Sequence, residues 1–307
     1  MQHVPVLLEE VLEVMMPRDG GRYFDGTLGF GGHARAILDR SAPGGLLAGT
    51  DLDGTAISRL SGSLAQYSGR VHLFQGNFTE IDRVCTMLGW EKLDGVLLDL
   101  GMSSTALDDP DRGFSFLRPG PLDMRFSPES PLSADTVVNT YDENRLASII
   151  REYGEERFAP RIARRIVESR PVSSTTHLSE IVSSAIPRRF WPKKIHPATR
   201  TFQAIRMEVN QEIQNLRSFL PKAVSLLAKG GVIAVISFHS LEDRIVKRFL
   251  AGTPDRFVYP RGLPAPPSQG ETALELITRR PITPSAKELR DNPRSRSARL
   301  RAARRVS

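Results

Sequence analysis

A glycine-rich segment and two acidic residues are the parts of this sequence most suited to binding a ligand. Residues 25–33 (DGTLGFGGH) follow a short apolar run, and Asp51 and Asp99 each end another such run. Glycines at a turn of this kind let the backbone approach a ligand closely, and an acid about 20 residues further on can bind both hydroxyls of a ribose. Dinucleotides and S-adenosylmethionine are both bound in this way. The pattern therefore predicts a nucleotide-like cofactor at the carboxyl ends of neighbouring strands.

The order of the glycines distinguishes these two classes of cofactor. The dinucleotide fingerprint is GxGxxG, whereas Gly26, Gly29 and Gly31 follow the order GxxGxG. A GxxxxGK[ST] phosphate-binding motif does not occur in the sequence. Asp25, which begins the turn, would repel a pyrophosphate and attract a cationic sulfonium. These features favour S-adenosylmethionine.

Two further strand ends carry residues that could act on a substrate. Asp99 and Ser103 lie in residues 94–104 (DGVLLDLGMSS), where an apolar run passes into a polar loop. His239 follows another apolar run over residues 232–237. Ligands of open α/β sheets bind outside the carboxyl ends of the strands, so these three side chains are candidate catalytic residues.

A structural role is the alternative at these positions. Asp99 could cap a helix that follows it. Ser240 and Asp243 are expected to cap a helix over residues 241–250, which would leave His239 available to line the cleft.

The single cysteine and the histidines argue against other chemistries. Cys85 lies at helical spacing from Ile81, Val84 and Leu88, so it is expected in the core and not as a nucleophile. Methylation at C5 of a pyrimidine usually needs a thiolate. One cysteine also excludes an intramolecular disulfide and a multi-thiolate metal site, and the six histidines lack ligand spacing, so no metal is expected.

The candidate residues need elements that bring them together. Short apolar runs alternate with amphipathic stretches, which predicts βαβ units and a parallel sheet. The predicted strands cover residues 22–25, 46–51, 71–75, 96–99, 232–237 and 274–278. The predicted helices cover residues 33–39, 56–64, 81–88, 210–227 and 241–250.

A segment of another kind interrupts this pattern. Residues 105–130 are rich in Asp, Pro, Gly and Arg, which predicts a long ordered loop, and residues 133–220 show helical periods without strands. The predicted fold is α/β: a doubly wound, Rossmann-like domain from residues 1–104 and 217–307, with a helical insertion over residues 105–216. The length of 307 residues is consistent with two domains.

The positive charge is unevenly distributed. Residues 279–307 hold ten basic and two acidic residues, a net charge of +8, so the other 278 residues sum to −1 in a chain of +7. Residues 188–206 add six basic residues and no acid. Both segments are candidates for phosphate contact, and solvated basic surface is the alternative. The aromatic residues show no interleaved aromatic–basic strand pattern, so no single-strand stacking module is expected.

Several long strings together resemble one family, the MraW/RsmH type of bacterial ribosomal small-subunit RNA cytosine-N4 methyltransferases. Besides residues 25–33 and 94–104, these strings are 3–9 (HVPVLLE), 112–116 (RGFSF), 120–125 (GPLDMR), 153–156 (YGEE), 196–206 (HPATRTFQAIR), 236–247 (ISFHSLEDRIVK) and 292–297 (NPRSRS).

The resemblance implies a class I methyltransferase domain with a helical substrate-recognition insertion and S-adenosylmethionine as donor. It also implies methyl transfer to the N4 amine of a cytidine in the decoding region of the small-subunit ribosomal RNA, within the assembled subunit in the cytoplasm. The cofactor contacts that it implies are Gly31, Gly32, His33, Asp51, Phe78 and Asp99. The family usually has Gln where this chain has Ala106, so an amide contact from that position is lost.

The implied chemistry assigns roles to the three candidate catalytic residues. Many amino-methyltransferases place an Asn/Asp/Ser-Pro-Pro-aromatic loop after the fourth strand, and residues 94–104 take its place here. Asp99 and Ser103 would accept the hydrogens of the amine, and His239 would orient the base or take the released proton.

Other functions remain open on the sequence alone. They are a DNA or protein methyltransferase, a non-catalytic RNA-binding ribosome assembly factor that retains the fold, and, least favoured by the glycine order, an NAD oxidoreductase. No apolar run reaches the roughly 18 residues of a membrane span, and the start lacks a secretion signal. Residues 299–307 are expected to form a loose basic tail, whose removal would weaken RNA binding and spare cofactor affinity.

Overall fold

The computed structural model describes residues 5–102, 109–252 and 274–307, and it divides into two compact units. Unit 1 combines Met1–Gly101 with Gln214–Ser307, and unit 2 is Met102–Ile213. The boundaries expected from the sequence, after residues 104 and 216, each lie three residues beyond these.

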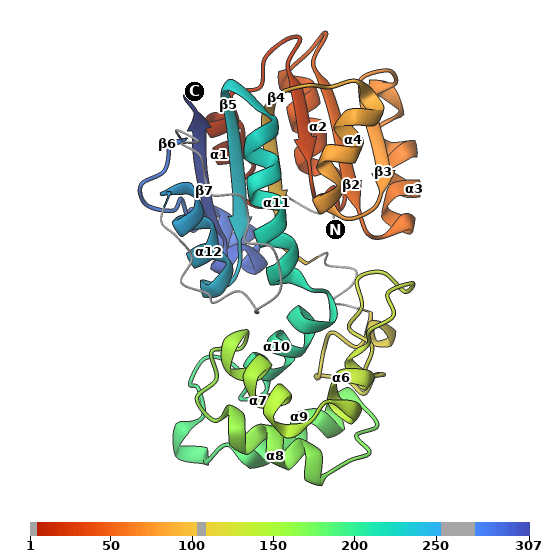
Figure 1. The fold of residues 1–307 in the computed structure, drawn as a ribbon, viewed down its shortest axis with the longest axis vertical. Helices are drawn as coiled ribbons and strands as arrows, with labels where there is room; N and C mark the ends of the chain where they lie inside the picture. Colours follow the sequence, from red (N-terminus) through yellow and green to blue (C-terminus); the bar gives the residue numbers. More distant parts are fainter. Residues whose placement is uncertain (1–4, 103–108, 253–273) are drawn as a thin grey trace, which may run out of the picture. The chain divides into compact units, whose positions relative to one another are not determined.

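Unit 1 is built on a seven-stranded sheet with the order β3-β2-β1-β4-β5-β7-β6 (Figure 1). Strands β1 to β5 pair in parallel, whereas β7 is antiparallel to β5 and β6. The strands are β1 (Arg22–Asp25), β2 (Leu46–Asp51), β3 (Val71–Gln75), β4 (Leu93–Asp99), β5 (Leu227–Ser237), β6 (Leu274–Leu276) and β7 (Arg299–Arg305). The predicted Rossmann-like α/β fold is confirmed, and the winding direction reverses between β1 and β4, where such sheets bind ligands.

Helices cover both faces of this sheet. One face carries α1 (Leu8–Met15), α2 (Gly32–Arg40) and α3 (Gly54–Ser63), and the other carries α4 (Ile81–Leu88), α11 (Glu212–Leu226) and α12 (Ser240–Leu250) (Figure 1). Successive side chains of β1 serve the two faces, because strand side chains alternate. Tyr23 packs with α1 and α2, while the ring of Phe24 lies 6.5 Å from that of Phe219 on α11.

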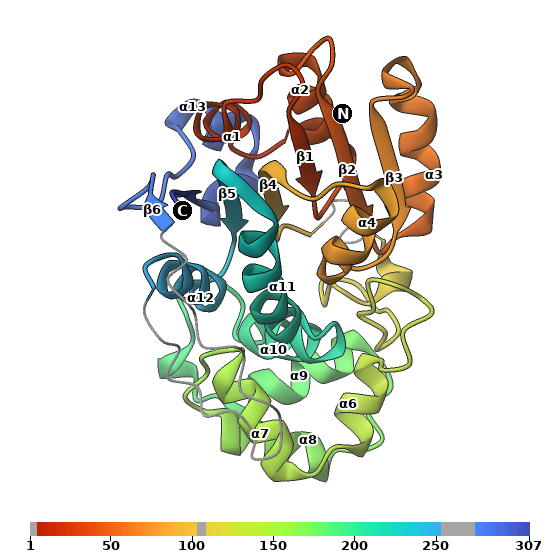
Figure 2. The same cartoon turned by 45° about the horizontal axis from the view of Figure 1, so that its top comes forward.

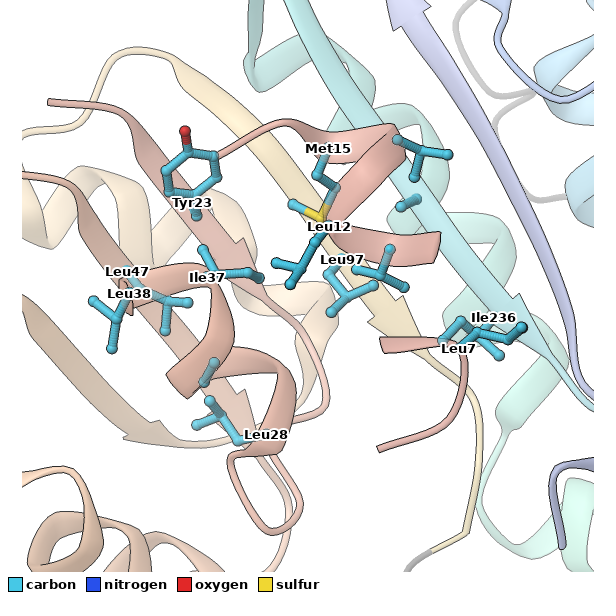
Figure 3. Close-up of a cluster of buried hydrophobic side chains, with 14 of the residues drawn as sticks. Leu7, Leu12, Met15, Tyr23, Leu28, Ile37, Leu38, Leu47, Leu97 and Ile236 are labelled. Carbon is cyan, nitrogen blue, oxygen red and sulfur yellow. The ribbon is translucent and has the colours of Figure 1, made fainter. Parts of the chain in front are cut away.

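The face below α1 and α2 holds a continuous apolar cluster (Figure 3). Leu12 and Met15 of α1 meet Ile37 of α2 and Leu97 of β4 there, all at most 8% exposed. The sequence prediction omitted α1, although its apolar residues recur at the three- and four-residue spacing of an amphipathic helix.

A second helix absent from the sequence prediction, α13 (Ala286–Asp291), lies beside α1 (Figure 2). The carboxylate of Glu288 accepts a hydrogen bond of 2.9 Å from the backbone N–H of Leu7. The contact joins the two ends of the chain sequence within unit 1.

Strand β5 begins earlier than the sequence predicts. The predicted strand covers residues 232–237, whereas β5 begins at Leu227, and Gly230 and Gly231 lie inside a register shift between the pairs Leu93–Leu227 and Gly95–Val232. Gly230 has φ of +82°, which suits a bulge that keeps the strand paired on both sides.

The expected loose tail over residues 299–307 is wrong. Residues 299–305 form β7, which pairs with β5 on one side and β6 on the other. Leu300 and Ala302 are fully buried in the apolar cluster. Removal of this segment would therefore take an interior strand out of the sheet, and it would not spare cofactor affinity.

Several arginines of β7 are held inside unit 1. Arg301 forms a bidentate ion pair with Asp243 of α12, at 2.6 and 3.2 Å, with both side chains at most 9% exposed. Arg305 donates to the carbonyls of Val224 and Leu227 at the end of α11. Burial alone would raise the pKa of Asp243, but Arg301 and Arg299 hold it below its usual value. Part of the C-terminal charge therefore stabilises the fold.

Unit 2 is helical in its described part (yellow to green in Figure 1). Its helices are α6 (Ala134–Thr140), α7 (Glu143–Glu152), α8 (Ala159–Glu168), α9 (Thr175–Ala185) and α10 (Thr199–Val209), with short 3₁₀ turns at Pro110–Arg112 and Arg188–Phe190. Asn210 ends α10, and its amide accepts from Phe126 N–H and donates to Met124 O, which fixes the preceding loop. The helix predicted over residues 210–227 therefore begins after Asn210, as α11.

The buried ion pair of β7 gives a stability prediction. Arg301→Met should lower the free energy of unfolding by about 3 kcal/mol, because it removes the main partner of a buried carboxylate. Arg299, whose side chain is 46% exposed, makes one bond of 3.0 Å to the same carboxylate. Arg299→Met should cost about 1 kcal/mol or less. Urea denaturation of both variants at neutral pH measures this, and equal losses would contradict it.

Candidate functional site

Three aspartates end neighbouring strands at the carboxyl edge of the unit 1 sheet. Asp25 ends β1, Asp51 ends β2 and Asp99 ends β4. The strands pair in parallel, so these ends share one edge, and Asp25 is close enough to Asp51 and Asp99 for their charges to raise its pKa. The expected convergence of acids at the winding reversal is present.

The glycine-rich turn is fixed between these strand ends by backbone hydrogen bonds. Gly26 N–H donates to Leu97 O of β4, and Leu28 N–H donates to Thr50 O of β2. The side chain of Leu28 enters the apolar cluster and is 3% exposed (Figure 3). Gly49 makes this insertion feasible, because a Cβ there would lie 2.5 Å from Leu28 Cδ2.

The end of the turn requires glycine for two reasons. Gly31 caps α2 with φ of +73°, a conformation that other residues rarely adopt. A Cβ at Gly31 would lie 2.4 Å from Leu60, and one at Gly32 would lie 2.2 Å from Pro5. The backbone at the start of α2 therefore packs closely against α3 and the N-terminal segment.

Asp51 is oriented by two backbone donors. Gly29 N–H donates to one carboxylate oxygen at 2.8 Å, and Asp53 N–H to the other at 2.9 Å. Burial raises the pKa of Asp51, and these hydrogen bonds offset part of the rise. Each carboxylate oxygen has a second lone pair, so the group can still accept from two ligand hydroxyls.

Asp25 is the most deeply buried acid of the three, at 1% exposure. Its Oδ1 accepts from Thr27 N–H at 3.0 Å, while Oδ2 has no hydrogen-bond partner among the described residues. Burial, and then the charges of Asp99 and Asp51, raise its pKa to about 7. A buried carboxylate with an unused oxygen is suited to a cationic ligand group.

Asp99 lies beside the histidine that follows the glycine turn. His33 Nε2 is 3.7 Å from Asp99 Oδ2, and the His33 side chain is 9% exposed. Gly101 N–H donates to Asp99 Oδ1 at 2.9 Å, and Asp99 N–H donates to Thr27 Oγ1 at 2.7 Å. Burial raises the pKa of Asp99 to about 6. Residues 100–102, directly after Asp99, form no helix, so the alternative that Asp99 caps a helix starting there is wrong. Ser103 and Ala106 lie outside the described residues.

Phe78 begins a 3₁₀ turn (Phe78–Glu80) that follows the end of β3. Asn77 and Glu80 form a capping box that fixes this turn. The Phe78 ring meets Phe219 of α11 edge to face, with centroids 5.1 Å apart. The Phe219 contact was not predicted, because α11 is more than 130 residues away along the chain.

His239 follows β5, the strand next to β4. The expected cap of Ser240 and Asp243 is wrong. Glu242 accepts from the N–H groups of Phe238 and His239, at 2.9 and 3.1 Å, while Asp243 binds the arginines of β7. His239 is partly exposed and is itself the N-cap residue of α12, in a capping box with Glu242, so it is part of the cap that was expected to leave it available.

The donor set of this edge fits an organic cation. The described residues contain no group of three or more His, Cys, Asp or Glu side chains placed to hold a metal ion. None of the helices in the same ranges is long and apolar enough to span a membrane. The buried oxygen of Asp25, the acceptors of Asp51 and the close backbone at Gly31 match a ligand with a cationic group and a ribose.

The sheet order is that of a Rossmann-like fold, and the strand ends form a site suited to a nucleotide-like cation. The chain belongs to the MraW methylase family, whose model matches residues 1–306, so it is a methyltransferase whose cofactor is S-adenosylmethionine.

Two similar curated relatives of this chain carry the same name. This chain is 47% identical over 308 residues to the "Ribosomal RNA small subunit methyltransferase H" of Syntrophotalea carbinolica, and the alignment covers 99% of this chain and 98% of the relative. It is 48% identical over 304 residues to the protein of the same name from Geobacter sulfurreducens, covering 98% of each. A solved rRNA methylase from Streptococcus thermophilus aligns over 100% of both chains with a TM-score of 0.45 and 9% identity.

The pKa of Asp25 predicts a pH-dependent cofactor affinity. A cationic ligand favours the ionised carboxylate, so binding at pH 6 must first remove a proton that is already lost at pH 8. With a pKa of about 7 in the free protein, S-adenosylmethionine should bind about tenfold more tightly at pH 8 than at pH 6. Isothermal titration calorimetry measures the affinity and the protons released.

Asp25→Asn keeps the acceptor for Thr27 N–H and should remove most of this dependence, whereas Asp53→Asn, outside the buried edge, should retain it. Any titration of S-adenosylmethionine itself affects all three proteins equally, so it cancels in the comparison.

The same raised pKa means that the folded state binds the Asp25 proton more tightly than the unfolded chain does. Stability of the cofactor-free protein should therefore fall as pH rises from about 4 to about 7. An unchanged pH profile in Asp25→Asn would contradict the assignment.

Proposed function

We propose that this methylase transfers a methyl group from S-adenosylmethionine to the exocyclic N4 amine of a cytidine in the small-subunit ribosomal RNA. The observation that carries the RNA assignment is the near full-length similarity, at 45–48% identity, to relatives named as ribosomal RNA small subunit methyltransferases. We extend the proposal to the decoding region, the assembled subunit and the cytoplasm on the resemblance in the sequence strings.

The site residues divide between the parts of the cofactor. Asp51 would bind the ribose hydroxyls, and Phe78 would flank the adenine. Asp25 and Asp99 would face the cationic aminoacyl sulfonium. Gly31, Gly32 and His33 lie at the start of α2, where backbone N–H groups favour a carboxylate.

The position of the single cysteine supports an amine as the methyl acceptor over a ring carbon. Cys85 is 1% exposed on α4, and burial raises its pKa to about 11. A neutral buried thiol cannot attack a pyrimidine ring at neutral pH. The C5 reaction therefore lacks its nucleophile in this chain.

The chain has to make a weak nucleophile reactive. The lone pair of an exocyclic amine is delocalised into the base, so acceptors that bind its hydrogens localise it on nitrogen. S-adenosylmethionine, when bound, would supply an electrophilic methyl group. Transfer to the amine would break the methyl–sulfur bond, leave a neutral thioether and require the amine nitrogen to lose one proton. Asp99, with a pKa near 6, is mostly ionised at neutral pH and is our candidate acceptor. Ser103 and His239 are proposed as a second acceptor and as the group that orients the base or takes the proton.

The target base has to leave its stack to reach the edge of the sheet. A single-stranded loop makes this step less costly than a duplex does. We propose that unit 2 holds the RNA, since its described part forms a separate helical body.

The role of Asp99 is tested by substitution at the two ends of β4. Asp99→Asn should lower the single-turnover rate at saturating cofactor by about 100-fold or more, because an amide does not replace a charged acceptor. Asp94→Asn, at the start of the same strand, alters a structural contact to Arg18 and should leave the rate within about twofold of the parent. A parental rate in Asp99→Asn would refute the assignment.

The product itself tests the proposed function. Small subunits from cells lacking this protein should gain N4-methylcytidine when incubated with the purified chain and S-adenosylmethionine, as measured by mass spectrometry of the nucleosides. Methylation at another atom would overturn the N4 assignment. Methylation of DNA or protein in place of the subunits would overturn the RNA assignment.

A further inference from the structure

Unit 2 carries a surface on which arginines lie over aromatic rings. The guanidinium carbon of Arg157 is 4.7 Å from the centroid of Phe158 and 4.3 Å from that of Phe190. Arg189 lies 4.8 Å from the Phe190 centroid, and Arg188 lies 5.9 Å from a ring centroid of Trp191. We name this set the Arg–aromatic cluster; it comprises Arg157, Phe158, Arg188, Arg189, Phe190 and Trp191.

Local structure fixes the rings that support the arginines. The indole N–H of Trp191 donates to Ile186 O at 2.9 Å. Phe158 N–H donates to the carboxylate of Glu156, which is 5% exposed, and the Phe158 and Phe190 rings lie 5.4 Å apart. Phe190 and Trp191 are nevertheless each 38% exposed. The cluster is thus ordered and open to solvent.

The charges of this cluster are not neutralised within the described chain. Five other arginines of unit 2 lie within 4.0 Å of glutamates, in the pairs Arg145–Glu208, Arg164–Glu143, Arg165–Glu168, Arg200–Glu156 and Arg206–Glu212. Arg157, Arg188 and Arg189 have no carboxylate within 4.0 Å among the residues described. The exposed Lys193 and Lys194 follow Trp191 closely in sequence. Two acids precede Arg157: Glu155, which is exposed, and Glu156, which is buried and accepts from Phe158 N–H.

The six basic residues of the segment 188–206 fall into two groups in the structure. Arg206 is 11% exposed and bound to Glu212, and Arg200 lies 3.8 Å from Glu156, so these two serve the fold. Four basic residues of the segment remain for a partner: Arg188, Arg189, Lys193 and Lys194.

We propose that the Arg–aromatic cluster binds a single-stranded segment of RNA, with Arg188 and Arg189 on phosphates and a base stacked on the guanidinium or indole planes. Planar guanidinium groups pair bidentately with phosphates, and both guanidinium and indole planes stack with unpaired bases. The rings hold the arginines in place, so less side-chain entropy is lost on binding. This inference rests on the proposed function, because it supplies the substrate contact of the same reaction.

The test compares variants of equal charge within unit 2. Binding of a fluorescent single-stranded oligoribonucleotide of about ten nucleotides is measured across a salt series. Arg188→Gln/Arg189→Gln should raise Kd about tenfold and lower the slope of log K against log salt by about 1.4. Arg151→Gln/Arg164→Gln removes two exposed arginines of α7 and α8 that contact no ring in the described structure, and it should change Kd less than threefold.

A variant that keeps every charge separates ordered arginines from simple charge. Phe190→Leu should raise Kd about threefold with an unchanged salt slope, because it removes the support and not the cations. Both cluster variants should retain parental affinity for S-adenosylmethionine, and should raise KM for small subunits without lowering kcat.

The outcomes distinguish this inference from the proposed function. If the parent chain methylates small subunits but the cluster pair behaves like the control pair, the inference is wrong and the function stands. If polyglutamate displaces the oligonucleotide as effectively as unlabelled RNA does, the cluster is a general anion site and not an RNA site. If a duplex binds as well as the single strand, the cluster is not specific for single-stranded RNA. If the parent neither binds the RNA nor methylates subunits, the proposed function itself fails.

Discussion

The parallel pairing of β1, β2 and β4 is the constraint on which this molecule depends, because it brings three aspartates to one edge of a sheet. Burial there opposes ionisation of all three, and the charges of Asp99 and Asp51 further oppose the ionisation of Asp25. The result is a carboxyl with a pKa of about 7 and another of about 6 in the cofactor-free protein. Ionised carboxylates at such an edge are destabilised when no positive charge is near them. A bound sulfonium would stabilise them, so the edge is suited to a cationic cofactor.

Elsewhere in the chain, too, many charged side chains are paired with partners inside the protein. The C-terminal segment is strongly basic, yet β7 uses Arg301 and Arg305 to bind Asp243 and the end of α11. In unit 2, paired arginines stabilise helices, while Arg157, Arg188 and Arg189 rest on aromatic rings. Net charge therefore indicates little about RNA contact until the internal partners are known.

Local patterns predicted most of the sheet and its acidic edge. Strands β1, β2 and β3, and the acids that end β1 and β2, follow from short apolar runs and the glycines near them. The sequence predictions that were wrong concern residues whose partners are distant in sequence. Residues 299–305 look like a solvated tail until β5 and β6 pair with them, and Asp243 looks like a cap until Arg301 reaches it. Phe219 meets Phe78 through the return of the chain after unit 2, and no local period reports such a contact. Site roles beyond these positions stay predictions.

The proposed cofactor site depends most directly on Asp25, which we expect to be about half protonated at neutral pH in the free protein and ionised when S-adenosylmethionine is bound. Carbon-13 NMR titration of the aspartate carboxyls, assigned with Asp25→Asn, measures this directly. We expect the Asp25 carboxyl to titrate near pH 7 in the free protein, and to remain ionised down to about pH 5 with S-adenosylmethionine but not with the uncharged thioether of S-adenosylhomocysteine. An Asp25 carboxyl that titrates near pH 4 in the free protein, or responds equally to both ligands, would contradict it.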